Sequence, residues 1–161
     1  MIVREIVLEE FLTHVSLTKT KLFKISTQGI YNSKLHYHSR SKVIDTIKTF
    51  IKFSIADTTA INPKNFPLKI HLIFYAPINW GNVRMSKGVL RWTPAKSGYH
   101  PIHDLDNLAW VWGKTIQDCL VERGIIPEDT VEFINRIEYQ FISVENFNDR
   151  KIVVRLISGS E

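Results

Sequence analysis

The sequence predicts an α+β protein in which a small mixed β-sheet packs against two main helices. Apolar residues recur at helical spacing in two segments, and they alternate with polar residues in others. At 161 residues with 44% hydrophobic content, the chain is long enough to bury one core. We therefore expect a single domain over residues 1–161.

The first 42 residues divide into an apolar part and a basic part. Residues 2–17 are rich in β-branched and aliphatic side chains, which favours a strand within them. Lys19, Lys21 and Lys24 then begin a run of cations interleaved with aromatic residues and histidines. Such a run can lie along a nucleic-acid backbone, and the alternative is a solvated loop.

A first helix is predicted from Ser41, with Ser39 or Ser41 as its N-cap. Its apolar stripe has spacings of three and four residues and consists of Ile44, Ile47, Ile51 and Ile55. We expect this helix to be scaffold.

The next predicted elements are a strand and a long irregular segment. Leu68–Phe74 alternates as a strand that ends at Pro77, and 78–102 contains several turn residues. A loop or hairpin of that length is usually functional or mobile. We expect it to contact the substrate through its basic residues, Arg84, Lys87, Arg91 and Lys96.

The last part of the chain predicts two strands. Val131–Ser143 and Lys151–Ile157 are separated by a polar turn at 145–149, which suggests an antiparallel hairpin.

Charge is distributed unevenly along the chain. Residues 1–103 carry fifteen Lys and Arg against five Asp and Glu, whereas residues 104–132 carry two against seven. A basic body that surrounds an acidic patch fits an anionic partner with a metal ion bound beside it.

The acidic patch begins with Asp104 and Asp106. In extended chain these two side chains point the same way and can converge on one hard cation. Asp106 or Asn107 can then cap a second helix, which ends at Gly124. Its predicted buried stripe is Leu108, Trp112, Thr115 and Cys119.

Further along this helix, Lys114 and Asp118 share a side with Asp106. Lys114 can contact a phosphate and stabilise charge in a transition state, or it can form an exposed pair with Asp118. Glu128 and Asp129 follow in a turn after the helix, where a third carboxylate can join the first pair on a magnesium ion.

Together these residues resemble the RusA family of Holliday junction resolvases, which are small magnesium-dependent homodimeric endonucleases of phage and prophage origin. Asp104, Asp106 and Asn107 match its DxDN element. Lys114 and Asp118, followed by Cys119 and Leu120, match its helical Lys and Asp-Ala-Leu element, and Glu128 and Asp129 match its distal acidic pair. Lys114 lies about one helical turn further from the Asn than the family pattern has it.

The resemblance implies that the protein nicks phosphodiesters in four-way DNA junctions during recombination and repair, as a homodimer. It implies that Asp104, Asp106 and Asp129 bind Mg²⁺, with Mn²⁺ as a substitute, and that Lys114 joins them in catalysis. Neighbours that can support this site are Asn107, Asp118, Glu128 and His103.

Alternative interpretations remain open. The shifted Lys114 allows a junction-binding protein with impaired catalysis, and the same motifs allow a nuclease of other branched DNA. His100 and His103 before the acids suggest zinc or manganese more weakly. The single Cys119 and the absence of a membrane span or signal-like segment lead us to expect a cytoplasmic protein that does not bind membranes.

Overall fold

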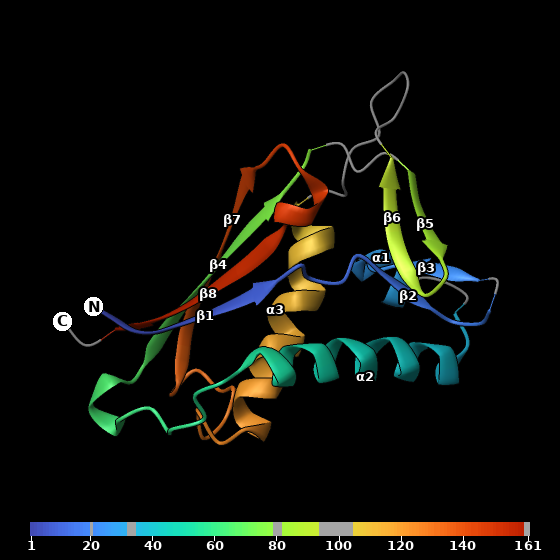
Figure 1. Cartoon of the computed structure of the whole chain (residues 1–161). Helices are drawn as coiled ribbons and strands as arrows, with labels where there is room; N and C mark the ends of the chain where they lie inside the picture. Colours follow the sequence, from blue (N-terminus) through green and yellow to red (C-terminus); the bar gives the residue numbers. More distant parts are fainter. Residues whose placement is uncertain (20, 32–34, 79–81, 94–104, 160–161) are drawn as a thin grey trace.

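The computed structural model describes residues 1–19, 21–31, 35–78, 82–93 and 105–159 (Figure 1). These residues form a mixed α+β structure, which confirms the predicted class. The strands are β1 Ile2–Glu9, β2 His14–Ser16, β3 Leu22–Lys24, β4 Leu68–Ala76, β5 Asn82–Ser86, β6 Val89–Thr93, β7 Ile134–Ser143 and β8 Lys151–Ser158. The α-helices are α1 Thr27–Tyr31, α2 Tyr37–Ser54 and α3 Leu105–Glu122, and the 3₁₀ turns are η1 Pro63–Asn65 and η2 Phe147–Asp149.

The main sheet has the strand order β1-β8-β4-β7. β4 and β7 are parallel, and β8 is antiparallel to both of its neighbours, β1 and β4. The predicted β7–β8 hairpin is therefore wrong. β8 has the successive apolar residues Ile152, Val153 and Val154, all buried. In the structure β8 lies inside the sheet, between β1 and β4, while β7 lies at its edge.

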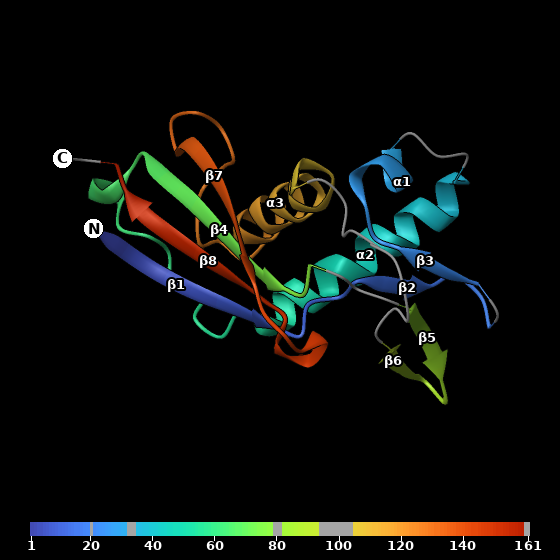
Figure 2. The same cartoon turned by 90° about the horizontal axis from the view of Figure 1, so that it is seen from above.

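Helix α3 is the crossover between the parallel strands β4 and β7 (Figures 1 and 2). Parallel strands need such a connection, because the chain must return to the opposite end of the sheet before the second strand begins. The start of α3 consequently lies toward the carboxyl ends of β4 and β7. In open sheets, ligand sites commonly occur at that end.

The packed face of α3 is the one that the sequence predicts. Leu108, Trp112, Thr115 and Cys119 are all buried. Gly113 lies so close to β7 that an added Cβ would be 2.7 Å from the Tyr139 hydroxyl. The helix ends before Gly124, whose φ of +69° is a conformation that glycine adopts without strain.

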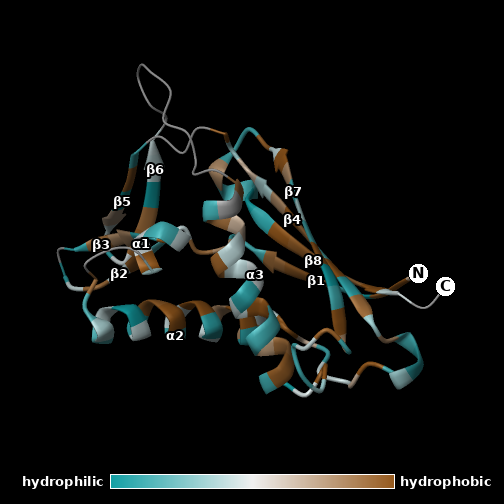
Figure 3. Cartoon of the chain, turned by 180° about the vertical axis from the view of Figure 1, so that it is seen from behind, coloured by the Kyte–Doolittle hydropathy of each residue, from teal (hydrophilic) through white to brown (hydrophobic). Residues whose placement is uncertain are grey.

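Helix α2 begins earlier than predicted. It starts at Tyr37, and His36 is the N-cap, with its ring nitrogen accepting a hydrogen bond from the backbone N–H of His38. Ser39 and Ser41 lie inside the helix, so neither is the cap. The predicted stripe is confirmed for Ile47, Ile51 and Ile55, which are buried, and Ile44 is half-buried. Figure 3 shows the matching alternation of apolar and polar segments along α2.

Two short hairpins lie away from the main sheet (Figure 1). β2 pairs with β3 across the start of the basic N-terminal run, and β5 pairs with β6 within the long segment 78–102. The β5–β6 turn contains Lys87 and Gly88, both with positive φ, as the tightest hairpin turns require. None of the helices in the described ranges is long and apolar enough to cross a bilayer.

Candidate functional site

The first predicted element of the site is the acidic pair before α3. Helix α3 begins at Leu105, so Asp106 and Asn107 both lie within its first turn. Asp106 is therefore neither in an extended segment nor at the N-cap position. The prediction that an extended chain aligns the side chains of Asp104 and Asp106 is wrong, because Asp106 is helical. Asp104 itself, the side chain of Asp106, and Lys96, His100 and His103 lie outside the residues that the structure describes.

Asn107 attaches a second element to the start of α3. Its side-chain Oδ1 accepts a hydrogen bond of 2.8 Å from the backbone N–H of Gln28, and its carbonyl accepts one of 2.9 Å from the Thr27 hydroxyl. Gln28 is in the first turn of α1, so Asn107 satisfies a backbone N–H there instead of capping its own helix. The chain that leaves the β2–β3 hairpin is thus held against the start of α3.

Lys114 brings together two of the predicted acidic residues. Its Nζ lies 2.6 Å from Oδ2 of Asp129 and 3.0 Å from Oδ1 of Asp118. The pKa of Lys114 is raised and that of Asp129 is lowered, mainly because of the hydrogen bond between them. The predicted i, i+4 pair with Asp118 is present, and the turn after α3 does return to the helix.

The same ionic cluster extends to α2. Lys48 Nζ lies 2.7 Å from Glu122 and 3.9 Å from Asp118, and Lys52 also pairs with Glu122. Cations and carboxylates therefore alternate from α2 through α3 to the turn at Asp129. The pairing of Lys48 and Lys52 with Glu122 was not predicted, because Glu122 is 74 residues from Lys48 in the chain and no spacing signal connects the two segments.

The acidic pair and the ionic cluster occupy different parts of α3. Lys114 is eight residues after Asp106, which corresponds to about 12 Å along a helix axis. Because Lys114 also contacts Asp118, its ammonium group is directed away from the start of the helix. Among the described residues, no three His, Cys, Asp or Glu side chains form a group that could hold a metal ion. Glu128 is exposed in the turn beside Asp129.

The predicted DNA-binding cations differ in accessibility. Lys19, Lys21, Arg84, Lys87 and Arg91 are exposed on or beside the two hairpins. Lys24 is only partly exposed, and this burial lowers its pKa. The accessible cations therefore form two groups, one on each hairpin.

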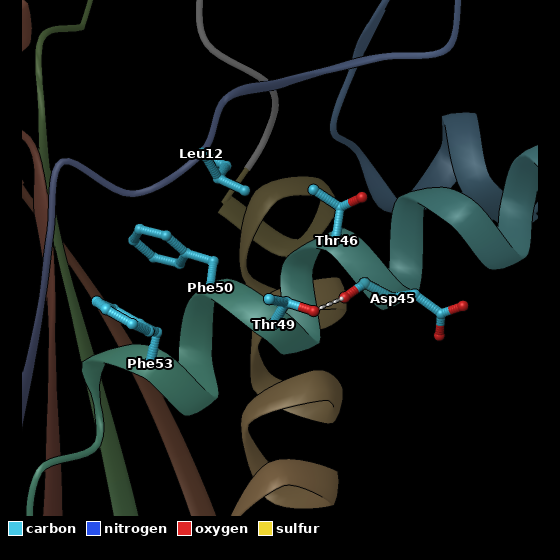
Figure 4. A pocket seen from close by; sticks show the side chains of 6 residues that line it. All are labelled: Leu12, Asp45, Thr46, Thr49, Phe50 and Phe53. Atoms are coloured by element: carbon cyan, nitrogen blue, oxygen red, sulfur yellow. Dashed lines mark hydrogen bonds between the residues drawn. The ribbon is translucent and has the colours of Figure 1, made fainter.

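A hollow on α2 is a different kind of surface (Figure 4). It has a volume of about 460 Å³ and is lined by Leu12, Asp45, Thr46, Thr49, Phe50 and Phe53. Phe53 is 94% exposed. This lining includes a carboxylate and no cation, so it does not suit a phosphate backbone.

No protein-family model matches the chain, and a search of curated proteins found no match. The resemblance to the RusA family therefore depends on the acidic and basic motif residues alone.

Proposed function

We propose that this protein is a divalent-metal-dependent endonuclease of branched DNA, with the four-way junction as its substrate. The observation that carries this proposal is that two basic hairpins lie together on one side of α3, beside its start (Figures 1 and 2). Asn107 holds α1, just after the β2–β3 hairpin, against this helix end. The β5–β6 hairpin comes between β4 and α3 in the chain, and it lies beside the β2–β3 hairpin (Figures 1 and 2).

In this proposal, Asp104 and Asp106 provide the metal-binding carboxylates. Two carboxylates suit Mg²⁺, which keeps several waters and takes its other ligands from substrate phosphates. A divalent ion held there would supply Lewis-acid activation of a phosphodiester toward hydrolysis. The exposed cations of the hairpins, among them Arg84 and Lys21, would hold the flanking phosphates.

Asp129 is the third carboxylate that the resemblance implies. Its side chain is 36% exposed, and that of its ion-pair partner Lys114 is 45% exposed. Ion pairs this exposed contribute about 0.2–1 kcal/mol to the free energy of unfolding. A DNA phosphate or a cation can therefore separate them at small cost. For Asp129 to join Asp106, the turn at 127–129 must also move along α3, which makes this the most demanding part of the proposal.

The second candidate is a protein that binds junctions without cutting them. The observation that favours it is that Lys114 and Asp129 are paired with each other, away from the start of α3. In that case the basic hairpins would bind the DNA while the acidic residues contribute charge and structure. Homodimer formation is part of both candidates, and it derives from the RusA resemblance.

A cleavage assay on a labelled four-way junction, with and without Mg²⁺, tests the two candidates. We expect the wild type to cut the junction when Mg²⁺ is present. Asp106→Asn should lower the rate by at least about 100-fold, because it removes metal-binding charge, while junction binding stays equal or becomes tighter. Asp45→Asn on α2 is the matched control, because Asp45 is an exposed acid away from α3.

Undiminished cleavage by Asp106→Asn and Asp104→Asn would refute the proposed active site. Binding without any cleavage by the wild type would favour the second candidate. A parallel series with flap and linear duplex substrates identifies the preferred branched structure, and gel filtration measures whether the protein is a dimer.

A further inference from the structure

A groove between β6 and η2 shares Arg91 with the DNA-binding cations named above, and its other lining residues have not been assigned a role. It has a volume of about 700 Å³. Its lining has two walls, which are residues 89–93 of β6 and residues 146–149 around η2. η2 follows β7 and lies at the carboxyl end of the parallel strands, as the start of α3 does (Figure 1). Because η2 forms one wall of the groove, the groove is at this end of the sheet.

The two walls meet through an aromatic stack. The rings of Trp92 and Phe147 are nearly parallel, with 5.9 Å between centroids and an interplanar angle of 6°. On Phe147 the guanidinium of Arg150 lies 4.1 Å from the ring centroid. Phe147 is buried, so Trp92 is the partly exposed ring of this stack, and a ring already held in place can bind a planar ligand without first reorganising.

Arg150 makes this platform rigid. It is buried, and its nitrogens donate to the carbonyls of Phe11 at 2.8 Å, Phe147 at 3.0 Å and Glu10 at 3.3 Å. These three carbonyls belong to the chain after β1 and to η2. The η2 wall is thereby fixed to the main sheet, and Trp92 fixes the β5–β6 hairpin to that wall.

The rim of the groove carries a mixture of polar groups. Arg91 supplies a cation, and Asn148 supplies a side-chain amide, which is both donor and acceptor. Asn146 donates to Asp149 at 3.2 Å. An aromatic surface, an amide and a cation together match a nucleobase joined to a phosphate, because the base stacks and the amide bonds its edge.

We propose that this groove binds one unpaired nucleobase of a DNA substrate. The base packs against Trp92, Asn148 contacts its edge, and Arg91 contacts the adjoining phosphate. This inference rests on the proposed function, in which branched DNA reaches the same end of the sheet. It goes further by assigning a binding site for single-stranded DNA to residues that the acidic motif does not include.

The test measures binding of a short single-stranded oligonucleotide containing 2-aminopurine, with the corresponding blunt duplex as the comparison. Metal is left out, so the result does not depend on cleavage. The wild type should bind the single strand more tightly than the duplex and quench 2-aminopurine fluorescence by stacking. Asn148→Trp fills the groove and should weaken single-strand binding about tenfold, the size expected for one lost stacking contact.

Asn135→Trp is the matched control, because Asn135 is exposed near the beginning of β7, at the other end of that strand from η2. It should bind the oligonucleotide as the wild type does. Asn148→Leu, a milder change at an exposed position, should lose discrimination among bases, and circular dichroism of both Asn148 variants verifies folding.

Wild-type affinity and quenching in both Asn148 variants would overturn the proposal, as would equal binding of single strand and duplex by the wild type. These results are distinct from failure of the proposed function. If the wild type cuts junctions and the Asn148→Trp variant binds the single strand normally, the groove proposal alone is refuted. If the wild type cuts no DNA and the Asn148→Trp variant loses single-strand binding, the nuclease proposal is refuted and the groove proposal is supported.

Discussion

Replacing Gly113 by alanine tests how closely α3 lies on the sheet. The added Cβ would be 2.7 Å from the Tyr139 hydroxyl oxygen and 3.1 and 3.3 Å from the ring atoms Cε1 and Cζ. Alanine in place of glycine in a helix interior contributes about 1 kcal/mol of stability. Overpacking a filled site costs about 1–3 kcal/mol. We therefore expect Gly113→Ala to lower the free energy of unfolding by about 1 kcal/mol in the wild type.

The sign of this effect should reverse when Tyr139 is removed. In a Tyr139→Ala background the obstructing ring is absent, so Gly113→Ala should raise stability by about 1 kcal/mol. Urea unfolding of the four proteins then gives a coupling energy of about 2 kcal/mol between the two positions. Stabilisation of the wild type by the full helix-propensity gain would refute the close approach.

Gly124 provides the internal control for this cycle. Its Cβ would meet no atom within 4 Å, but its φ is +69°, so Gly124→Ala is strained by its backbone alone. We expect it to destabilise by about 1 kcal/mol, equally with and without the Tyr139 ring. A difference between the two backgrounds would show that Tyr139→Ala disturbs α3 as a whole.

Two further predictions concern titration and thiol reactivity. The pKa values of Asp129 and Glu122 are lowered, mainly by hydrogen bonds to Lys114 and Lys48 respectively. The contribution of each carboxylate to the free energy of unfolding is therefore fully present above its unfolded-state pKa, and it is lost as pH falls through its folded-state pKa. Asp129→Asn and Glu122→Gln should each cost at most about 1 kcal/mol at pH 7, and less as the pH is lowered. Urea unfolding measured over a range of acidic pH would contradict this if the cost did not decrease with pH. Burial raises the pKa of Cys119 to about 11. A disulfide reagent at pH 8 should therefore modify this thiol only as fast as the protein unfolds. Immediate labelling of the native protein would refute the burial of Cys119.

The helices were predictable because their apolar spacing reflects burial directly. Ile47 and Ile51 on α2, and Trp112 and Cys119 on α3, are buried as their periodicity predicts. The start of α2 was not predictable from serines, because His36 provides the capping acceptor instead. The position of β8 was missed because a short loop after β7 favours a hairpin locally. In the structure β8 pairs instead with β1 and β4, and its apolar run Ile152, Val153 and Val154 is buried there.

The candidate site was predictable only where its contacts are local. Lys114 and Asp118 are four residues apart on one helix, so their pair follows from helical geometry. The partners of Asn107 and of Lys48 are 79 and 74 residues away in sequence. Such contacts depend on how α1, α2 and α3 pack together, which spacing along the chain does not specify.

The pairing of β1 with β8 has a consequence for the order of folding. Within the described sheet, β8 is the sole neighbour of β1, and Glu5 contacts Arg155 across 150 residues of sequence. During synthesis β1 leaves the ribosome first among these strands and must wait for β8 before its backbone groups find sheet partners. The completed sheet therefore forms after translation of β8, and contacts of such long sequence separation make its assembly slow. Until then, the apolar side chains of β1 are exposed to chaperones and to other nascent chains.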